Sequence, residues 1–388
     1  MSKKIAVGID IGTFQIKVVV AELLKEKTKS IPRVIGRGIA ESKGLRHGYI
    51  INQNDIIKSL EKAINQAERS SGIKIKRAYV SIGGVSLEGI ISTGATVITK
   101  GDNEITEIDV QKVIDSSESN IQLLNKKVIH SIPIQFKLDD KKLIGRPIGM
   151  RGKKLEVQTL FITYLKQHLE DIIHAVEAIG IDVEDIIAAP IASSIVTLTK
   201  SQKIAGCVLA NLGSETISII VFENNIPISL ETFPVGSTNI TNDIALGLKI
   251  PLEEAEKIKV GSIKGVSYSK KKLDEIITSR LNNIFELIEA HLKKIKRNEL
   301  LPAGIILTGG GSGITTIEDI AKAYLKLPSK VASINFLNNS NSKIKDSTWA
   351  VAYGLCVFGL TTEHESKSGK IFKDIKNKLL ELLKNFSV

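Results

Sequence analysis

The sequence predicts an α/β protein with a duplicated core, and three observations support this prediction. A strand–turn–strand pattern occupies residues 5–22 and recurs at residues 205–222. A glycine-rich turn at residues 309–313 separates a short strand pattern from a helical one. An amphipathic segment at residues 370–388 follows a polar stretch. The chain has 388 residues, which is enough for about two to three domains.

The first strand–turn–strand unit begins close to the start of the chain. Residues 5–9 read as a short apolar strand, Gly12 and Thr13 form the turn, and residues 16–21 form a second strand rich in valine. A hairpin of this kind places backbone N–H groups at its tip, where they face an anion. The unit therefore predicts a phosphate-binding turn.

The second unit repeats this pattern about 200 residues later along the chain. Residues 207–211 read as a strand, Gly213 and Ser214 as the turn, and residues 216–222 as the returning strand. Two such tips that face each other would grip the phosphates of a nucleotide from both sides. Hairpins with glycine at the turn are common, so this prediction depends on both copies together.

The third glycine turn follows the strand at residues 305–308. It runs from Gly309 to Gly313 and leads into a helical pattern at residues 317–321. Glycines between a strand and a helix permit close approach of a flat ligand or a phosphate, and the helix N-terminus favours negative charge. The alternative is a flexible loop, but three glycine turns in this order favour a ligand site.

Composition limits the classes of function. The formal charge is +11 with a pI near 9.3, yet aromatic residues make up 4% of the chain, and we find no zinc-finger spacing or basic recognition helix. Nucleic acid is therefore not an expected partner, and anionic membrane lipid is the better one. No signal peptide is indicated, Cys207 and Cys356 are expected to be buried reduced thiols, and the six scattered histidines suggest no metal cluster.

The amphipathic segment at residues 370–388 is predicted to lie on a membrane surface. At 100° per residue its apolar side chains share an arc of about 120°, and lysines occupy the opposite side. It is too short and too charged to span a bilayer, which requires about 20 mainly apolar residues. The alternative is a helix that packs on the protein's own core. The predicted membrane contacts are Ile371, Phe372, Lys373, Ile375, Lys376, Leu379, Leu382, Leu383 and Phe386.

These motifs resemble the actin-like ATPase superfamily and, within it, the FtsA family of bacterial cell-division proteins. Residues 8–13 are similar to the first phosphate motif, residues 211–216 to the second, and residues 307–312 to the adenosine motif. The segments at 236–259 and 349–355 resemble the connecting motifs. The resemblance implies a duplicated core of the ribonuclease H-like type with a nucleotide cleft between its halves.

A segment between the first two motifs resembles the inserted α+β subdomain that is characteristic of FtsA. The resemblance lies at residues 75–84, 132–139 and 147–155. The subdomain boundaries expected on this basis are 1–76 with 160–200 and 348–362 for the first core subdomain, 77–159 for the insert, 203–238 with 302–347 for the second core subdomain, 239–301 for a smaller helical subdomain, 363–369 for a linker, and 370–388 for the membrane-targeting helix.

The resemblance also implies ATP and Mg²⁺ as cofactors. Asp10 would order the metal through water, and Asn211 would be a weak metal position. Phosphate and nucleoside contacts would come from the glycine turns and their neighbours. The implied ATP-binding residues are Gly12, Thr13, Lys17, Gly213, Ser214, Thr216, Gly236, Glu253, Glu256, Lys257, Gly309, Gly310, Gly311 and Ser312.

Departures from the superfamily pattern bear on hydrolysis. Asn211 stands where an aspartate usually opens the second phosphate motif, and an amide neither supplies negative charge nor acts as a base. Ser214 and Glu215 replace paired glycines, and Ser218 replaces a later aspartate. We therefore expect slow or absent hydrolysis. The sequence assigns no catalytic residue and leaves open whether the chain is an enzyme.

The function implied by the resemblance is that of a peripheral protein on the cytoplasmic face of the cell membrane at the division site. It would polymerise with copies of itself, bind anionic lipid through its tail helix, and tether FtsZ alongside other division proteins. Two alternatives remain: an adaptor like the pilus-assembly protein PilM, which binds a membrane-protein tail in place of lipid, and a small-molecule kinase of the same superfamily.

Overall fold

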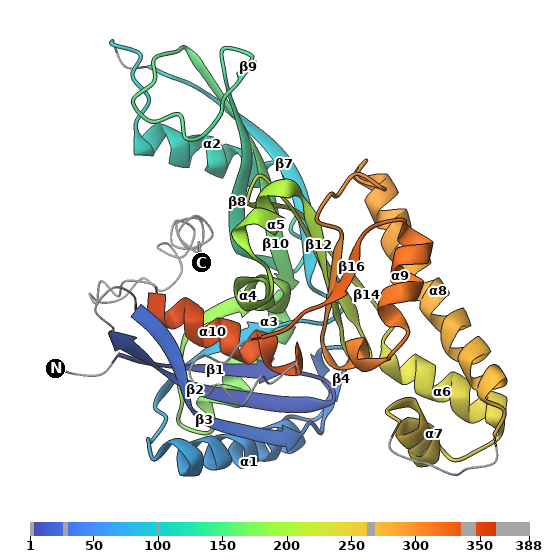
Figure 1. Ribbon diagram of the computed structural model, residues 1–388. Helices are drawn as coiled ribbons and strands as arrows, with labels where there is room; N and C mark the ends of the chain where they lie inside the picture. Colours follow the sequence, from blue (N-terminus) through green and yellow to red (C-terminus); the bar gives the residue numbers. More distant parts are fainter. Residues whose placement is uncertain (1–3, 26–29, 100, 262–267, 335–346, 362–388) are drawn as a thin grey trace.

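The computed structural model describes residues 4–25, 30–99, 101–261, 268–334 and 347–361. Two five-stranded sheets form the centre of the molecule, and a four-stranded sheet extends from it (Figure 1). The strands of the first sheet are β1 (Ile5–Ile11), β2 (Gln15–Lys25), β3 (Ser30–Glu41), β6 (Arg77–Ile82) and β11 (Asp182–Ala188). Those of the second are β12 (Cys207–Leu212), β13 (Ile217–Glu223), β14 (Ile226–Phe233), β15 (Ile305–Thr308) and β16 (Ser329–Val331).

The two central sheets share one topology. Their orders are β11-β6-β1-β2-β3 and β14-β13-β12-β15-β16. In each sheet the three strands that come first in the sequence are antiparallel neighbours. A fourth strand then pairs in parallel with the first, and a fifth pairs in parallel with the fourth. The predicted duplication of an α/β core is therefore confirmed.

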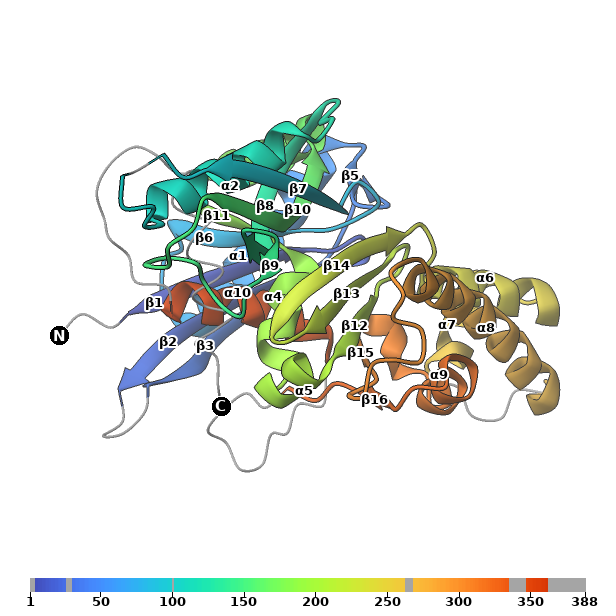
Figure 2. The same cartoon turned by 90° about the horizontal axis from the view of Figure 1, so that it is seen from above.

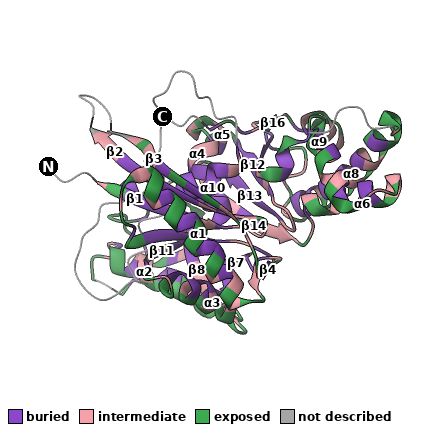
Figure 3. Ribbon diagram, turned by 90° about the horizontal axis from the view of Figure 1, so that it is seen from below, coloured by how far each residue is buried: buried purple, intermediate pink, exposed green. Residues whose placement is uncertain are grey.

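Two buried helices, α4 (Ala189–Thr197) and α10 (Ala350–Thr361), lie between the central sheets (Figure 2). α10 is apolar on all sides and is buried along nearly its whole length, which is typical of a helix inside a core (Figure 3). Gly354 permits its close contact with α4, because a Cβ there would lie 1.9 Å from the carbonyl oxygen of Ala192. The outer helices of this half are α1 (Gln53–Ser71) and α3 (Lys166–Glu177).

The insert is an antiparallel sheet with one helix. Its elements are β7 (Glu88–Val97), α2 (Glu107–Ser119), β8 (Lys126–Leu138), β9 (Lys141–Lys142) and β10 (Lys154–Leu165). Val113 of α2 packs with Phe136 and Leu155 in a small separate core. The insert is therefore the α+β unit that the fold prediction included.

One strand assigned to the insert from the sequence lies elsewhere. β6, at residues 77–82, pairs in parallel with β1 and β11 and so belongs to the first central sheet. Its residues from Ala78 to Ile82 are all buried, which suits a strand in the middle of a sheet that is covered on both faces. The subdomain limits otherwise remain a prediction.

The remaining helices cover the second sheet and form the helical part of the second half. They are α5 (Lys200–Ala205), α6 (Ser237–Leu248), α7 (Leu252–Lys259), α8 (Lys270–Lys294) and α9 (Ile317–Leu325), with short 3₁₀ turns at Gly310–Gly313 and Ser347–Trp349 and a small hairpin of β4 (Leu45–Arg46) and β5 (Tyr49–Ile50). α8 packs against α6 and α9, and its apolar face joins the core of the second sheet.

Several further predictions concern burial and the tail. Cys207 and Cys356 are free and buried, as predicted. The predicted linker and membrane-targeting helix, residues 363–388, lie outside the described residues. Within the described part of the chain, every helix is too short or too polar to cross a membrane.

Candidate functional site

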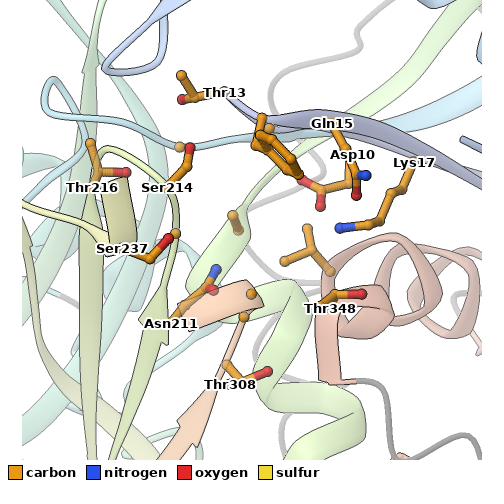
Figure 4. A pocket seen from close by; sticks show the side chains of 18 of the residues that line it. Asp10, Thr13, Gln15, Lys17, Asn211, Ser214, Thr216, Ser237, Thr308 and Thr348 are labelled. Atoms are coloured by element: carbon orange, nitrogen blue, oxygen red, sulfur yellow. The ribbon is translucent and has the colours of Figure 1, made fainter. Parts of the chain in front are cut away.

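The three glycine turns meet at one cavity between the two halves of the molecule. The cavity has a volume of about 330 Å³, and it is lined by Gly12 of the first half and by Gly213 and Gly309 of the second. A volume of this size is within the usual range for a small-molecule site, about 300–1,000 Å³. The duplicated sheets thus bring together turns that are far apart in the sequence (Figure 4).

On the side of the first half, the cavity is lined by two residues of opposite charge, Asp10 and Lys17. They are directly opposite each other in the antiparallel register of β1 and β2, and both line the cavity. The Ser81 hydroxyl at the end of β6 donates a 2.9 Å hydrogen bond to Asp10 Oδ1. Burial raises the pKa of Asp10, while Lys17 and the Ser81 hydrogen bond partly oppose that shift.

The second half carries the equivalent positions without charge. Asn211 on β12 lies opposite Ser218 on β13 in the same register that joins Asp10 to Lys17. Thr308 at the end of β15 is the parallel neighbour of Asn211, and all three side chains line the cavity. The two halves therefore have similar backbones at the cavity, but the ionisable pair lies in the first half.

The second glycine turn, at Gly213 and Ser214, rests on the N-terminus of α6. The backbone N–H of Ser237 donates to the carbonyl of Gly213 at 2.9 Å, and that of Thr238 donates to the carbonyl of Ser214 at 2.8 Å. Gly236 packs beneath the turn, since a Cβ there would lie 2.3 Å from the Ser214 carbonyl oxygen. Gly236 therefore supports the turn, whereas Ser237 and Thr238 line the cavity.

The third turn depends on Gly309. Its φ of 87° and ψ of 173° lie in a region that is essentially restricted to glycine, and it packs against Asn211 and Leu212. Ser312 is buried and donates a 2.7 Å hydrogen bond from Oγ to the Gly309 carbonyl, so it closes the turn from behind. Gly309 and Gly310 line the cavity.

Helix α7 contributes a polar pair to the lining of the cavity. Lys259 Nζ lies 2.7 Å from Glu256 Oε2, and it also donates to Thr241 Oγ1 at 2.9 Å and to the Ser237 carbonyl at 3.2 Å. Both Glu256 and Lys259 line the cavity. These contacts fix α7 against the start of α6.

The structure brings most of the predicted site residues to the cavity and leaves some outside it. Those that line it are Asp10, Gly12, Thr13, Lys17, Asn211, Gly213, Ser214, Thr216, Glu256, Gly309 and Gly310. Those among the predicted residues that do not line it are Gly236, Glu253, Lys257, Gly311 and Ser312. Glu253 and Lys257 are exposed on α7, and Gly311 packs against Leu212. Their roles toward a nucleotide stay a prediction.

Sequence reasoning missed several residues that line the cavity. They include Ser81 in β6, Gly83 and Gly84 directly after it, Lys259 on α7, and Ser347 and Thr348 before α10. Lys259 follows Glu256 by three residues, a spacing that places both on one side of a helix. Gly83 and Gly84 directly after the apolar strand at residues 77–82 are a second sequence signal, because a glycine pair at the end of a strand permits close approach of a ligand.

The residues present fit a nucleotide with Mg²⁺. The turns offer backbone N–H groups for phosphate, and Asp10 offers one carboxylate. Mg²⁺ is usually held by one or two carboxylates together with substrate phosphates and water. The described residues contain no group of three or more His, Cys, Asp or Glu side chains able to hold a metal by themselves, so phosphate would have to complete the coordination.

Comparison with solved structures agrees with this architecture. The PilM–PilN type IV pilus biogenesis complex contains a chain with a TM-score of 0.68 and 14% identity, and the match covers 92% of this chain and 98% of that one. MreB5 of Spiroplasma citri bound to ADP gives a TM-score of 0.51 at 13% identity and covers 92% and 96%. Fold and cavity together define an actin-like protein with an inserted subdomain.

Sequence comparison identifies the family within this class. A model described as "Cell division protein FtsA" matches residues 208–354, and one described as "SHS2 domain inserted in FTSA" matches residues 84–163, so together they match more than half of the chain. Cell division protein FtsA of Borreliella burgdorferi is 29% identical over 97% of this chain and 96% of the relative. That of Pseudomonas aeruginosa is 27% identical over 95% and 92%. The chain belongs to the FtsA family of cell division proteins, as predicted.

Proposed function

We propose that this cell division protein binds ATP with Mg²⁺ between its two core halves and assembles with further copies of itself on the cytoplasmic face of the membrane. The observation that supports the proposal most strongly is the convergence of all three glycine turns on one cavity. Anionic phosphate would be held by backbone N–H groups and by Lys17, and Mg²⁺ would neutralise the remaining charge near Asp10.

Hydrolysis of the bound ATP is expected to be slow. In the described part of the cavity the acidic side chains are Asp10 and Glu256, and Glu256 is held by Lys259 and Thr241. In the second half, Asn211 and Ser218 occupy the positions that correspond to Asp10 and Lys17, and neither side chain is a carboxylate. A water molecule beside the terminal phosphate therefore has no evident base on the side of the second half. The same lack argues against a small-molecule kinase.

The membrane part of the proposal comes from the sequence of residues 370–388. One amphipathic helix binds a lipid surface weakly, but a filament that carries many copies binds firmly through multivalency. A membrane-bound filament would then link the tubulin-like protein FtsZ and other division proteins to the division site. Membrane lipid is anionic on the cytoplasmic side, which suits the lysines of this segment.

Co-sedimentation with anionic liposomes tests this proposal. The full chain and a chain truncated after Glu365 are compared with and without ATP and Mg²⁺, and neutral liposomes serve as the lipid control. We expect ATP to increase pelleting of the full chain and truncation to abolish it. Equal pelleting of both chains would instead favour the alternative in which the protein, like a pilus-type adaptor, binds a protein partner.

A further inference from the structure

An acidic side chain on the second phosphate turn reaches across the cleft to the first half. Glu215 follows the cavity-lining Ser214. Its Oε1 lies 2.8 Å from Arg46 Nε, and its Oε2 accepts a 2.6 Å hydrogen bond from the backbone N–H of His47. Arg46 is the last residue of β4, and His47 begins the turn to β5, so one carboxylate is bound twice by the opposite half of the core.

The turn that holds Glu215 is itself fixed to the first half. Gly48 has a φ of 89° and packs so closely on Gly84 that a Cβ would lie 2.5 Å from the Gly84 Cα. The buried Tyr164 hydroxyl lies 3.3 Å from the carbonyl oxygen of Gly48 and 3.0 Å from that of Gly83, with geometry for donation to either. The β4–β5 turn is thus a rigid support, which Tyr164 on β10 also connects to the inserted sheet.

The other end of the contact is equally well supported. The backbone of the second phosphate turn receives two hydrogen bonds from the N-terminus of α6, as described above. The Glu215 side chain is 15% exposed and that of Arg46 is 62% exposed. The ion pair therefore joins two rigid parts, and its arginine remains accessible to solvent and to salt.

We propose that Glu215, Arg46 and His47 form a latch across the cleft, which holds the two halves together beside the phosphate turns and slows release of a bound nucleotide. The part that concerns nucleotide rests on the proposed function. Arg46 also has a second effect, because an unneutralised Glu215 would repel phosphate at short range. Loss of Arg46 is therefore more harmful when Glu215 is present than when it is absent.

The first experiment needs no nucleotide. Spin labels on cysteines introduced at the exposed Lys62 of α1 and Glu286 of α8 report the distance between the halves by pulsed electron paramagnetic resonance. We expect Glu215→Ala, which removes both contacts, to shift the distribution to longer distances and to broaden it. Glu215→Gln, which can retain the hydrogen bond to His47, gives a smaller change.

A matched control comes from an ion pair that does not cross the cleft. Arg77 and Glu184 lie 2.9 Å apart at the paired edges of β6 and β11, with side chains 68% and 18% exposed, values close to those of the latch. Arg77→Gln is therefore expected to leave the distance between the halves unchanged. Distances that stay the same in Glu215→Ala and in Arg77→Gln would overturn the latch.

The second experiment measures the dissociation rate of a fluorescent ATP analogue in the presence of Mg²⁺. Arg46→Gln is expected to speed dissociation about three- to five-fold, because an ion pair with a solvent-exposed partner contributes about 1 kcal/mol or less. The same change in a Glu215→Gln background is expected to have little additional effect. Equal effects in both backgrounds would refute the role of Arg46 as the neutralising partner.

The two experiments test the latch and the proposed nucleotide function independently. If the unaltered chain binds no analogue, the proposed nucleotide function is wrong, and the distance measurement still decides whether the latch holds the halves together. If the analogue binds, but Arg46→Gln leaves its dissociation rate unchanged and Glu215→Ala leaves the distance unchanged, the latch is wrong and the proposed function stands.

Discussion

Replacement of Gly309 with alanine is expected to destabilise the protein by about 3 kcal/mol. The backbone conformation of Gly309, φ 87° and ψ 173°, costs a non-glycine residue about 1–3 kcal/mol. The new Cβ would also lie 2.3 Å from Asn211 Oδ1 and 2.6 Å from the Leu212 carbonyl oxygen, so the turn must shift. Because the same turn lines the cavity, binding of ATP is expected to weaken as well.

Two neighbouring glycines provide the comparison. A Cβ at Gly310 or at Gly313 meets no heavy atom within 4 Å, and neither residue has a positive φ. Gly310 lines the cavity and Gly313 does not. We therefore expect both alanine variants to keep the thermal stability of the unaltered chain, and Gly310→Ala alone of the two to weaken ATP binding.

The assay combines thermal unfolding by circular dichroism with a titration of Mg²⁺ and ATP for each of the three variants. Unaltered stability of Gly309→Ala would refute the steric reasoning. Equal ATP affinity of Gly310→Ala and Gly313→Ala would refute the assignment of this cavity to the nucleotide.

Three further predictions concern single ionisable groups. Asp10→Asn is expected to weaken Mg²⁺-dependent ATP binding at least about ten-fold while it leaves Mg²⁺-free binding nearly unchanged, as measured by titration with and without chelator. Burial lowers the pKa of Lys203 to about 8, below its unfolded value, so the charged side chain destabilises the fold at lower pH. Lys203→Met is therefore expected to raise the free energy of unfolding in urea by about 2–3 kcal/mol below pH 8. This gain should disappear as the pH rises to the unfolded pKa of 10.5. Burial lowers the pKa of His130 to about 3, and its Nε2 accepts a hydrogen bond from the Ala188 N–H. The neutral ring therefore contributes stability that is complete above pH 6.5 and is lost as the pH falls toward 3. A free energy of unfolding in urea that does not change over this pH range would contradict this assignment.

The parts of the fold that the sequence predicts well are those controlled by local pattern. Alternating apolar residues and a central glycine predict each hairpin, and the hairpin register then places Asp10 opposite Lys17. The continuous apolar run at residues 350–360 likewise indicates a buried helix, because every face of such a helix is apolar. These features need no knowledge of distant residues.

The features that the sequence does not predict depend on contacts between distant segments. β6 reads as part of the insert until its parallel pairing with β1 and β11 is known. Of the α7 residues that the sequence predicts, Glu256 lines the cavity, whereas Glu253 and Lys257 do not. The orientation of the helix instead brings Lys259 to the cavity beside Glu256. Glu215 and His47 are 168 residues apart, so no local pattern signals their contact.

Whether the cavity between the two halves binds ATP can be decided by a calorimetric titration of the full chain with ATP in the presence of Mg²⁺. We expect one ATP bound per chain, together with a rise in melting temperature on saturation, because a ligand that binds the folded state stabilises it. A folded chain that shows neither heat of binding nor a change in melting temperature at millimolar ATP would show that the cavity is not a nucleotide site.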